Sequence, residues 1–212
     1  MNPVRALAYR LRWHFPPPPD WSDMCGYELL LDAIERHRIA EVEGDVVEIG
    51  AFMGGGTYKL CRFFERASPE KTVYAIDVFE PGFDLTESLV GQSMADQYRL
   101  LLDGRDQRMV YDQITGSCTN LVTIAADSAT VSLPCAQVAY AHIDGNHRPE
   151  YVRGDFDLVW PRTTSGGIVS FDDYGHGFPP VTRTIHELIG EHAAEIDRFW
   201  TGGRRTIFVR RR

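Results

Sequence analysis

The fold is decided by the stretch Val46-Val47-Glu48-Ile49-Gly50-Ala51-Phe52-Met53-Gly54-Gly55-Gly56-Thr57. An apolar, β-branched run of this kind is typical of a strand buried on both faces of a parallel sheet. The glycines after it allow a sharp turn and a close approach of a ligand to the main chain. Residues 56–67 then have helical spacing. The stretch therefore predicts a strand, a ligand-binding turn and a helix; a tight turn without a ligand is the alternative.

The glycine turn does not fit a dinucleotide. A dinucleotide fingerprint requires Gly-x-Gly-x-x-Gly, and the second of these positions, counted from Gly50, is Phe52. Glu48, at the end of the strand, would also repel a pyrophosphate. An acid there suits a cation or a ligand rich in hydroxyl groups. S-adenosylmethionine offers both, because it carries a sulfonium, an ammonium and a ribose, so we expect it in preference to a nicotinamide cofactor.

Composition narrows the class of protein. The chain has 212 residues, an ordinary length for one α/β domain with a sizeable core. Its formal net charge of -8 argues against a nucleic-acid binder, which usually has a basic face. No apolar run approaches the ~20 residues that span a bilayer. The 4 cysteines form no C-x-x-C pair, so we expect a reducing cytoplasmic setting without disulfides or zinc.

Residues 1–40 are expected to form an amino-terminal helical arm. Arginines interrupt the apolar residues of the segment 1–14, which favours a short amphipathic helix over a signal peptide. The proline run 16–19 then ends any helix before it. Ser22 or Asp23 is expected to cap a second helix that continues to about Ala40. The proline-spaced arm could pack on a second subunit, and we expect a homo-oligomer such as a dimer.

The rest of the chain predicts a doubly wound sheet. Apolar runs predict strands at 45–50, 72–77, 121–125, 137–144 and 168–173, and helices are expected at 56–67, 149–160 and 179–195. Segments 196–201 and 205–209 flank a Gly-Gly pair, a hairpin signal. This pattern predicts one α/β domain over 1–212: a Rossmann-like, seven-stranded, mostly parallel sheet with an antiparallel C-terminal hairpin and helices on both faces. Residues 79–120, with a helix at 94–102, are expected to cover the substrate.

Carboxylates follow most of the predicted strands. The acids are Glu48, Asp77, Asp144 and the pair Asp172-Asp173. In a parallel sheet these strand ends share the edge where ligands bind, and four acids there would repel one another unless cations or hydroxyl donors share the site. Each acid alone could be a helix cap. Asp77 is positioned to accept hydrogen bonds from the two ribose hydroxyls, and Asp127-Ser128 could border an adenine edge.

The sequence also predicts a metal site. If the fourth and fifth strands are neighbours, the carboxylates of Asp144, Asp172 and Asp173 converge. Hard oxygen ligands favour Mg²⁺ or Mn²⁺ over zinc. A metal there could bind a substrate hydroxyl and lower its pKa. The alternative is that Asp172 and Asp173 only cap the next turn.

A histidine follows the first of these acids. His147 lies three residues after Asp144, and histidine is the natural proton acceptor near neutral pH. His147 could instead be a surface histidine, or one that only orients Asp144. His176 is a second candidate of lower rank, and His142 is expected to pack inside the sheet.

Three motifs together resemble a known family. The runs VVEIGAFMGGGT, IDGNH and GGIVSFDDY resemble class I S-adenosylmethionine-dependent methyltransferases, and more closely the macrocin O-methyltransferase group, which methylates sugar hydroxyls with the help of a metal. The resemblance covers roughly residues 22–175. It implies that Glu48 and Gly50 line the methionine part of the cofactor, that Asp77 holds the ribose and that the three aspartates are magnesium ligands.

The resemblance extends to other residues. Ser22-Asp23-Met24 is similar to a stretch that folds over the cofactor in that group. The full set of expected cofactor contacts is Met24, Glu48, Gly50, Ala51, Phe52, Gly54, Thr57, Asp77, Asp127, Ser128 and Asp144. Many relatives carry an aspartate base where this chain has Asn146, so we assign the base to His147, with Asp144 as its catalytic partner.

The sequence therefore predicts an S-adenosylmethionine- and Mg²⁺- (or Mn²⁺-) dependent O-methyltransferase. Its acceptor would be a sugar or glycosylated small molecule, or an oligosaccharide, rather than a nucleic acid or a membrane. Two alternatives stay open: a non-catalytic homologue that binds S-adenosylmethionine, and a nicotinamide-dependent oxidoreductase.

Overall fold

The structure is a computed structural model. It describes residues 7, 11–12, 16–19, 22, 26–175, 177–203 and 205–212. Most of the expected amphipathic helix at 1–14 lies outside these residues, as do Asp23, Met24 and His176.

A seven-stranded sheet with the order β3-β2-β1-β4-β5-β7-β6 forms the centre of the molecule. β1 to β5 pair in parallel, and β7 is antiparallel to both β5 and β6. The strands are β1 (Asp45–Ile49), β2 (Val73–Asp77), β3 (Leu121–Ala125), β4 (Val138–Ile143), β5 (Thr163–Phe171), β6 (Ile196–Gly202) and β7 (Thr206–Arg211). The predicted fold class is confirmed.

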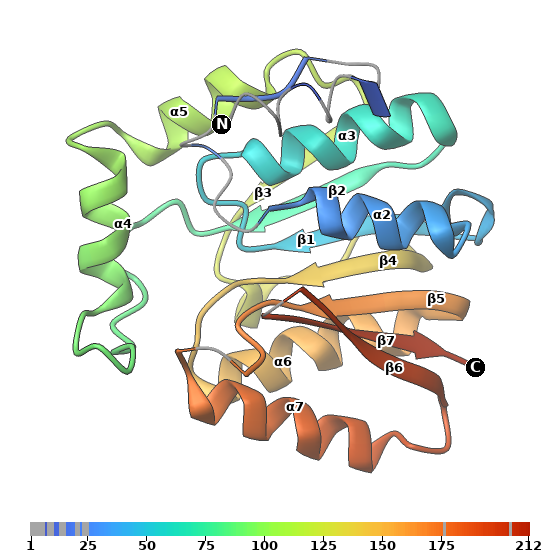
Figure 1. Cartoon of the computed structure of the whole chain (residues 1–212). Coiled ribbons are helices and arrows are strands. Elements are labelled where there is room, and N and C mark those ends of the chain that lie inside the picture. Colours follow the sequence, from blue (N-terminus) through green and yellow to red (C-terminus); the bar gives the residue numbers. More distant parts are fainter. Residues whose placement is uncertain are drawn as a thin grey trace.

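Helices cover both faces of the sheet (Figure 1). Val46 packs in the cluster that includes α2 and α3, whereas Val47 packs in the cluster that includes α6 and α7. Successive residues of a strand point to opposite faces, so a continuous apolar run is what this position requires. The helices are α2 (Glu28–Arg36), α3 (Gly55–Ala67), α4 (Met94–Leu102), α5 (Gln107–Thr115), α6 (Pro149–Val159) and α7 (Pro179–Glu191).

The central strand β4 is buried along its whole length. His142 is fully buried there, and its Nδ1 lies 2.9 Å from the Ser170 hydroxyl. Burial lowers the pKa of His142 to about 3. The expectation that His142 packs inside the sheet is confirmed, and its imidazole is neutral.

Some predicted boundaries are wrong. Helix α2 begins at Glu28, with Tyr27 at its N-cap, so Ser22 does not cap it, and Asp23 lies outside the described residues. β5 begins at Thr163 rather than 168, since its polar first half still pairs with β4. α7 ends at Glu191 and not at 195.

Helix α5 was not predicted. Asp106 caps it by accepting a hydrogen bond from the Met109 amide at 2.8 Å, and Val110 and Tyr111 are buried on its inner side. The cap and the apolar spacing were present in the sequence, but only a nine-residue segment carries them. Short helices of this kind are marginal without tertiary contacts.

The architecture brings the carboxyl ends of the parallel strands to one edge, and α4 lies beyond that edge (Figure 1). The strand order reverses between β1 and β4, which is where open α/β sheets bind ligands. The Asp144 amide donates to the Ile49 carbonyl at 2.8 Å, and the Asp172 amide donates to the Ile143 carbonyl at 3.0 Å. Among the described residues, no helix is long and apolar enough to cross a membrane.

Candidate active site

A cavity of about 1000 Å³ opens at this edge of the sheet. It is lined by the strand ends that carry Gly50, Asp77, Asp144 and Asp173, and by residues of the segment 79–120.

The glycine turn brings two strand ends into direct contact. Gly50 has a φ of +91°, and a Cβ atom built there would lie 1.9 Å from the Asp144 carbonyl oxygen. Only glycine tolerates both conditions. Ala51 and Phe52 then line the cavity, and the Phe52 amide donates to Asp77 Oδ2 at 2.8 Å. The turn thus connects the end of β1 to the ends of both neighbouring strands.

Asp77 lies at one end of the cavity. Its Oδ1 accepts the Phe79 amide at 2.6 Å and the Gln107 side-chain amide at 3.2 Å. Burial raises the pKa of Asp77, although these hydrogen bonds act in the opposite direction. A carboxylate has about four lone-pair sites, and the amides of Phe52, Phe79 and Gln107 use three of them.

Glu48 lies behind the cavity wall and does not line it. The side chain is fully buried. The Tyr27 hydroxyl donates to Glu48 Oε1 at 2.6 Å, and the Thr57 hydroxyl donates to Oε2. Tyr27, rather than Glu48 itself, faces the cavity.

The other expected cofactor residues divide into two groups. Ser128 and Asp144 line the cavity, whereas Gly54, Thr57 and Asp127 do not. Ser22, from the stretch that the resemblance places over the cofactor, lines the cavity as well. Gly54 instead makes room for α5, because a Cβ atom there would lie 2.9 Å from the side chains of Tyr111 and Thr115.

Asp127 has a local structural role. It caps the short helix at 128–130, since its Oδ1 accepts the Ala129 amide at 3.0 Å. Its Oδ2 accepts the Tyr151 hydroxyl at 3.0 Å. Tyr151 lines the cavity and Asp127 does not.

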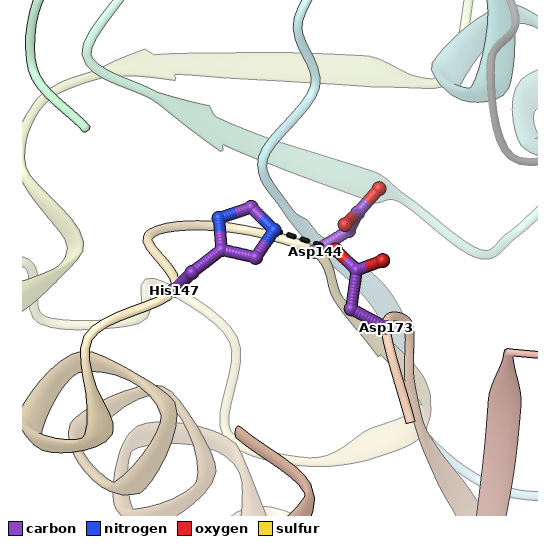
Figure 2. Close-up of side chains that lie close together, drawn as sticks. All are labelled: Asp144, His147 and Asp173. Atoms are coloured by element: carbon purple, nitrogen blue, oxygen red, sulfur yellow. Dashed lines mark hydrogen bonds and ion pairs between the residues drawn. The ribbon is translucent and has the colours of Figure 1, made fainter. Parts of the chain in front are cut away.

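An acid–histidine cluster occupies the other end of the cavity. One ligand atom from each of Asp144, His147 and Asp173 lies within 4.8 Å of the others. Figure 2 shows the His147 ring directed at Asp173, with Asp144 beside the pair. His147 Nε2 is 2.5 Å from Asp173 Oδ2, and Nδ1 is 2.6 Å from Asp84 Oδ2. The predicted convergence of the fourth and fifth strand ends is present for Asp144 and Asp173.

These contacts control the charge of His147. Burial alone would lower the pKa of His147, but the hydrogen bonds to Asp173 and Asp84 outweigh it and raise the pKa to about 10. The bond to His147 likewise holds the pKa of Asp84 below its usual value in spite of burial. The imidazole is therefore cationic in this arrangement, and its ring is held in one orientation. To accept a proton, the imidazole would first have to lose its hydrogen bond to one of the two carboxylates, which would lower its pKa.

Asp172 has different neighbours. Its Oδ2 lies 2.7 Å from Arg205 Nη2, and its Oδ1 accepts the Thr206 hydroxyl at 3.2 Å. The same Arg205 nitrogen is 2.6 Å from Asp173 Oδ1. Asp172, Asp173 and Asp144 together border a smaller space of about 260 Å³. Asp144, His147 and Asp173 thus bring together ligand atoms that could hold a divalent ion, and Asp172 shares its Arg205 contact with Asp173.

Several residues of the site were not predicted. Asp84, Tyr98 and Gln107 come from the segment 79–120, and Arg205 comes from the β6–β7 turn. Tyr98 packs its ring against Phe52, with centroids 4.9 Å apart. These residues follow no strand and match no motif. The only available signal was that a charged residue such as Asp84 or Arg205, if it is buried, needs a partner of opposite charge.

Asp155 is a buried acid behind the cavity. Burial raises the pKa of Asp155 to about 7, although a hydrogen bond with Ser128 opposes the shift. Its Oδ2 is 3.1 Å from the position of a Cβ atom on Gly145, which lines the cavity. The carboxyl is therefore largely neutral in the folded protein below pH 7.

We expect Asp155→Asn to stabilise the protein at high pH. An acid whose pKa rises on folding makes the folded state less stable as the pH increases from its unfolded to its folded pKa. At about 1.4 kcal/mol per pKa unit, the gain from Asn should be larger at pH 8 than at pH 5 by on the order of 2–3 kcal/mol. Urea unfolding at both pH values measures it. Asp157→Asn, at an exposed position of the same helix, is the control; a gain independent of pH would contradict the assignment.

Known proteins share this fold. NovP, an O-methyltransferase, is 21% identical over 86% of this chain and 79% of its own, with a TM-score of 0.65. CalS11, a calicheamicin methyltransferase, is 19% identical over 86% of this chain and 78% of its own, with a TM-score of 0.62. MycE, solved with Mg and SAH, is 15% identical over 92% of this chain and 55% of its own, with a TM-score of 0.51.

These likenesses at low identity show a common fold. No curated protein sequence matches the chain significantly. A family model described as "Methyltransferase domain" matches residues 47–174, a range that contains the glycine turn, Asp77 and the acid–histidine cluster. This match covers more than half of the 212 residues, and the chain therefore belongs to the methyltransferase-domain family.

Proposed function

We propose that the protein transfers the methyl group of S-adenosylmethionine to a hydroxyl of a sugar or glycosylated small molecule, with the help of Mg²⁺ or Mn²⁺. The observation that carries the proposal is one cavity with two acidic ends. Asp77 lies at one end, and Asp144, His147 and Asp173 lie at the other. A methyl donor with a ribose and a sulfonium matches this arrangement.

The cofactor would lie along the ends of β2, β1 and β4. Asp77 would accept the ribose hydroxyls, and the backbone at Gly50 and Ala51 would border the methionine part. Ser128 would border the adenine. Tyr27 and Tyr98 face the same space and would exclude water from the sulfonium, which strengthens electrostatic interactions there.

Asp144 and Asp173, with Asp172 or His147, would hold the divalent ion. Their carboxylate oxygens are the ligands that Mg²⁺ and Mn²⁺ prefer. When bound, such an ion lowers the pKa of a coordinated hydroxyl. Asp84 would keep the His147 ring in place, and Phe178 packs against that ring with centroids 4.2 Å apart. His147 would then take the acceptor proton once its imidazole is neutral.

The similar structures support the finer parts of the proposal. CalS11 is described as a TDP-rhamnose 3'-O-methyltransferase, and MycE was solved with Mg and SAH. Rossmann-like methyltransferases act on many acceptors, so fold alone does not assign one. The acidic cluster facing the cavity is the feature of this chain that favours a hydroxyl acceptor.

The expected result is methyl transfer that depends on a metal. S-adenosylmethionine should raise the melting temperature, because a ligand that binds only the folded state stabilises it, and NAD⁺ should not. Labelled methyl groups should appear on at least one member of a glycoside panel with Mg²⁺ and disappear with EDTA. Transfer that is unaffected by EDTA would remove the metal from the mechanism.

A second candidate is a homologue that binds S-adenosylmethionine without catalysis. It is favoured by Asn146, which cannot accept a proton and whose side-chain nitrogen is buried without a hydrogen-bond partner among the described residues. Stabilisation by the cofactor with no methyl transfer to any panel member would support it.

A further inference from the structure

Arg205 binds two carboxylates of the proposed metal site at once. Its Nη2 lies 2.7 Å from Asp172 Oδ2 and 2.6 Å from Asp173 Oδ1. Both aspartate side chains are almost fully buried, whereas that of Arg205 is 35% exposed. The guanidinium therefore enters the acid cluster from the cavity side, which it also lines.

The guanidinium contacts one oxygen of each of two carboxylates that would help to hold the divalent ion. An ion bound through those oxygens would bring a second positive charge close to the guanidinium, and two such charges repel strongly in a partly buried site. The ion and the guanidinium therefore exclude each other from the space between the two carboxylates.

The other oxygens of the pair have their own donors. Asp173 Oδ2 lies 2.5 Å from His147 Nε2, and Asp172 Oδ1 accepts the Thr206 hydroxyl at 3.2 Å. Arg205 contacts Asp172 and Asp173 with a permanent positive charge. Without that charge, the two buried carboxylates would repel each other in a medium that screens charge poorly.

We infer that Arg205 is an internal counter-ion for Asp172 and Asp173, which a divalent metal must displace in order to bind. The inference rests on the proposed metal-dependent function. It makes Arg205 the residue that lowers the affinity of the site for metal and stabilises the metal-free protein.

The displacement requires only the side chain to move. The Arg205 carbonyl accepts the Tyr174 amide at 2.8 Å, which connects the β6–β7 turn to the loop after β5. Because the guanidinium borders the large cavity, it can turn into that space while this backbone contact stays intact. The released charge would then face the acceptor end of the site.

The test is metal binding by calorimetry. Mn²⁺ is titrated into the wild type, Arg205→Gln and Arg198→Gln at one pH and ionic strength. Arg198 lies on β6 of the same hairpin, is half exposed and packs over Trp200. Arg198→Gln therefore also removes one positive charge, but at a position away from the acids. We expect Arg205→Gln to bind Mn²⁺ at least tenfold more tightly than the wild type, and Arg198→Gln to bind within twofold of it.

Unchanged or weaker Mn²⁺ binding by a folded Arg205→Gln would overturn the inference while leaving the metal site in place. If none of the three proteins binds Mn²⁺ although S-adenosylmethionine still raises the melting temperature, the metal part of the proposed function fails, and the inference fails with it.

If Arg205→Gln does not fold, the inference is tested on the wild type by NMR, through the side-chain NεH resonance of Arg205. It should shift on addition of Mg²⁺ if the guanidinium is displaced, and an unshifted signal at saturating Mg²⁺ would overturn the inference.

Discussion

Asp173→Asn is expected to lower kcat by about 10³-fold or more, while S-adenosylmethionine binding stays within a few fold of the wild type. Asp173 is the residue shared by every part of the acid cluster, because its two oxygens contact His147 and Arg205. Asn keeps the shape and removes the charge. It also tolerates the positive φ of 55° at this position, so the variant should fold.

Two measurements separate catalysis from binding in this variant. Single-turnover methyl transfer reports the chemical step, and calorimetry with S-adenosylmethionine reports the cofactor site. Asp157→Asn, an exposed change of equal charge on α6, should leave both within twofold. If Asp173→Asn keeps more than a tenth of wild-type turnover, Asp173 neither holds the metal nor positions His147 as the base.

Gly50→Ala is expected to destabilise the protein by about 5 kcal/mol, the upper end of two contributions. A left-handed backbone costs a residue with a Cβ roughly 1–2 kcal/mol, and overpacking adds about 1–3 kcal/mol or more. The added methyl would lie 1.9 Å from a backbone oxygen of Asp144, so no side-chain rotation can relieve the clash. Since a whole domain is stable by only about 5–15 kcal/mol, the variant should be close to unfolding at 25 °C.

Gly91→Ala is the matched control for this change. Gly91 has a φ of +73°, and nothing lies within 4 Å of a Cβ atom built there. Gly91→Ala therefore measures the free-energy cost of a left-handed backbone without the clash, which is about 1–2 kcal/mol. Guanidinium unfolding of both variants gives the difference. Equal losses at the two positions would show that the ends of β1 and β4 are not in the contact described.

The central sheet was predictable because its signals are local. β1 and β4 are buried on both faces, and this burial requires the continuous apolar runs that the sequence shows. Gly50 and Pro149 mark the turn and the helix start that follow two of these strands. The acids at the strand ends could be predicted to share an edge for the same reason, since parallel pairing brings them together.

The contacts made by the acids could not be predicted in the same way. Glu48 was expected at the ligand, and nothing in the sequence indicated that its oxygens accept the Tyr27 and Thr57 hydroxyls. Asp172 was expected to be a metal ligand with Asp144 and Asp173, and no sequence pattern indicated that it shares a contact to Arg205 with Asp173. In the sequence, Tyr27 is 21 residues from Glu48 (48−27), and Arg205 is 33 residues from Asp172 (205−172). Strand periodicity contains no information about such pairs.

The bond between Asp84 and His147 has a consequence for the timing of catalysis. Asp84 belongs to the segment between β2 and α4, and its carboxylate holds the ring from the side opposite Asp173. If this contact opens when an acceptor enters, the imidazole loses one of the two carboxylates that keep it cationic, and its pKa falls. The base would then become competent only with an acceptor bound, and an empty pocket would be protected from transferring its methyl group to water.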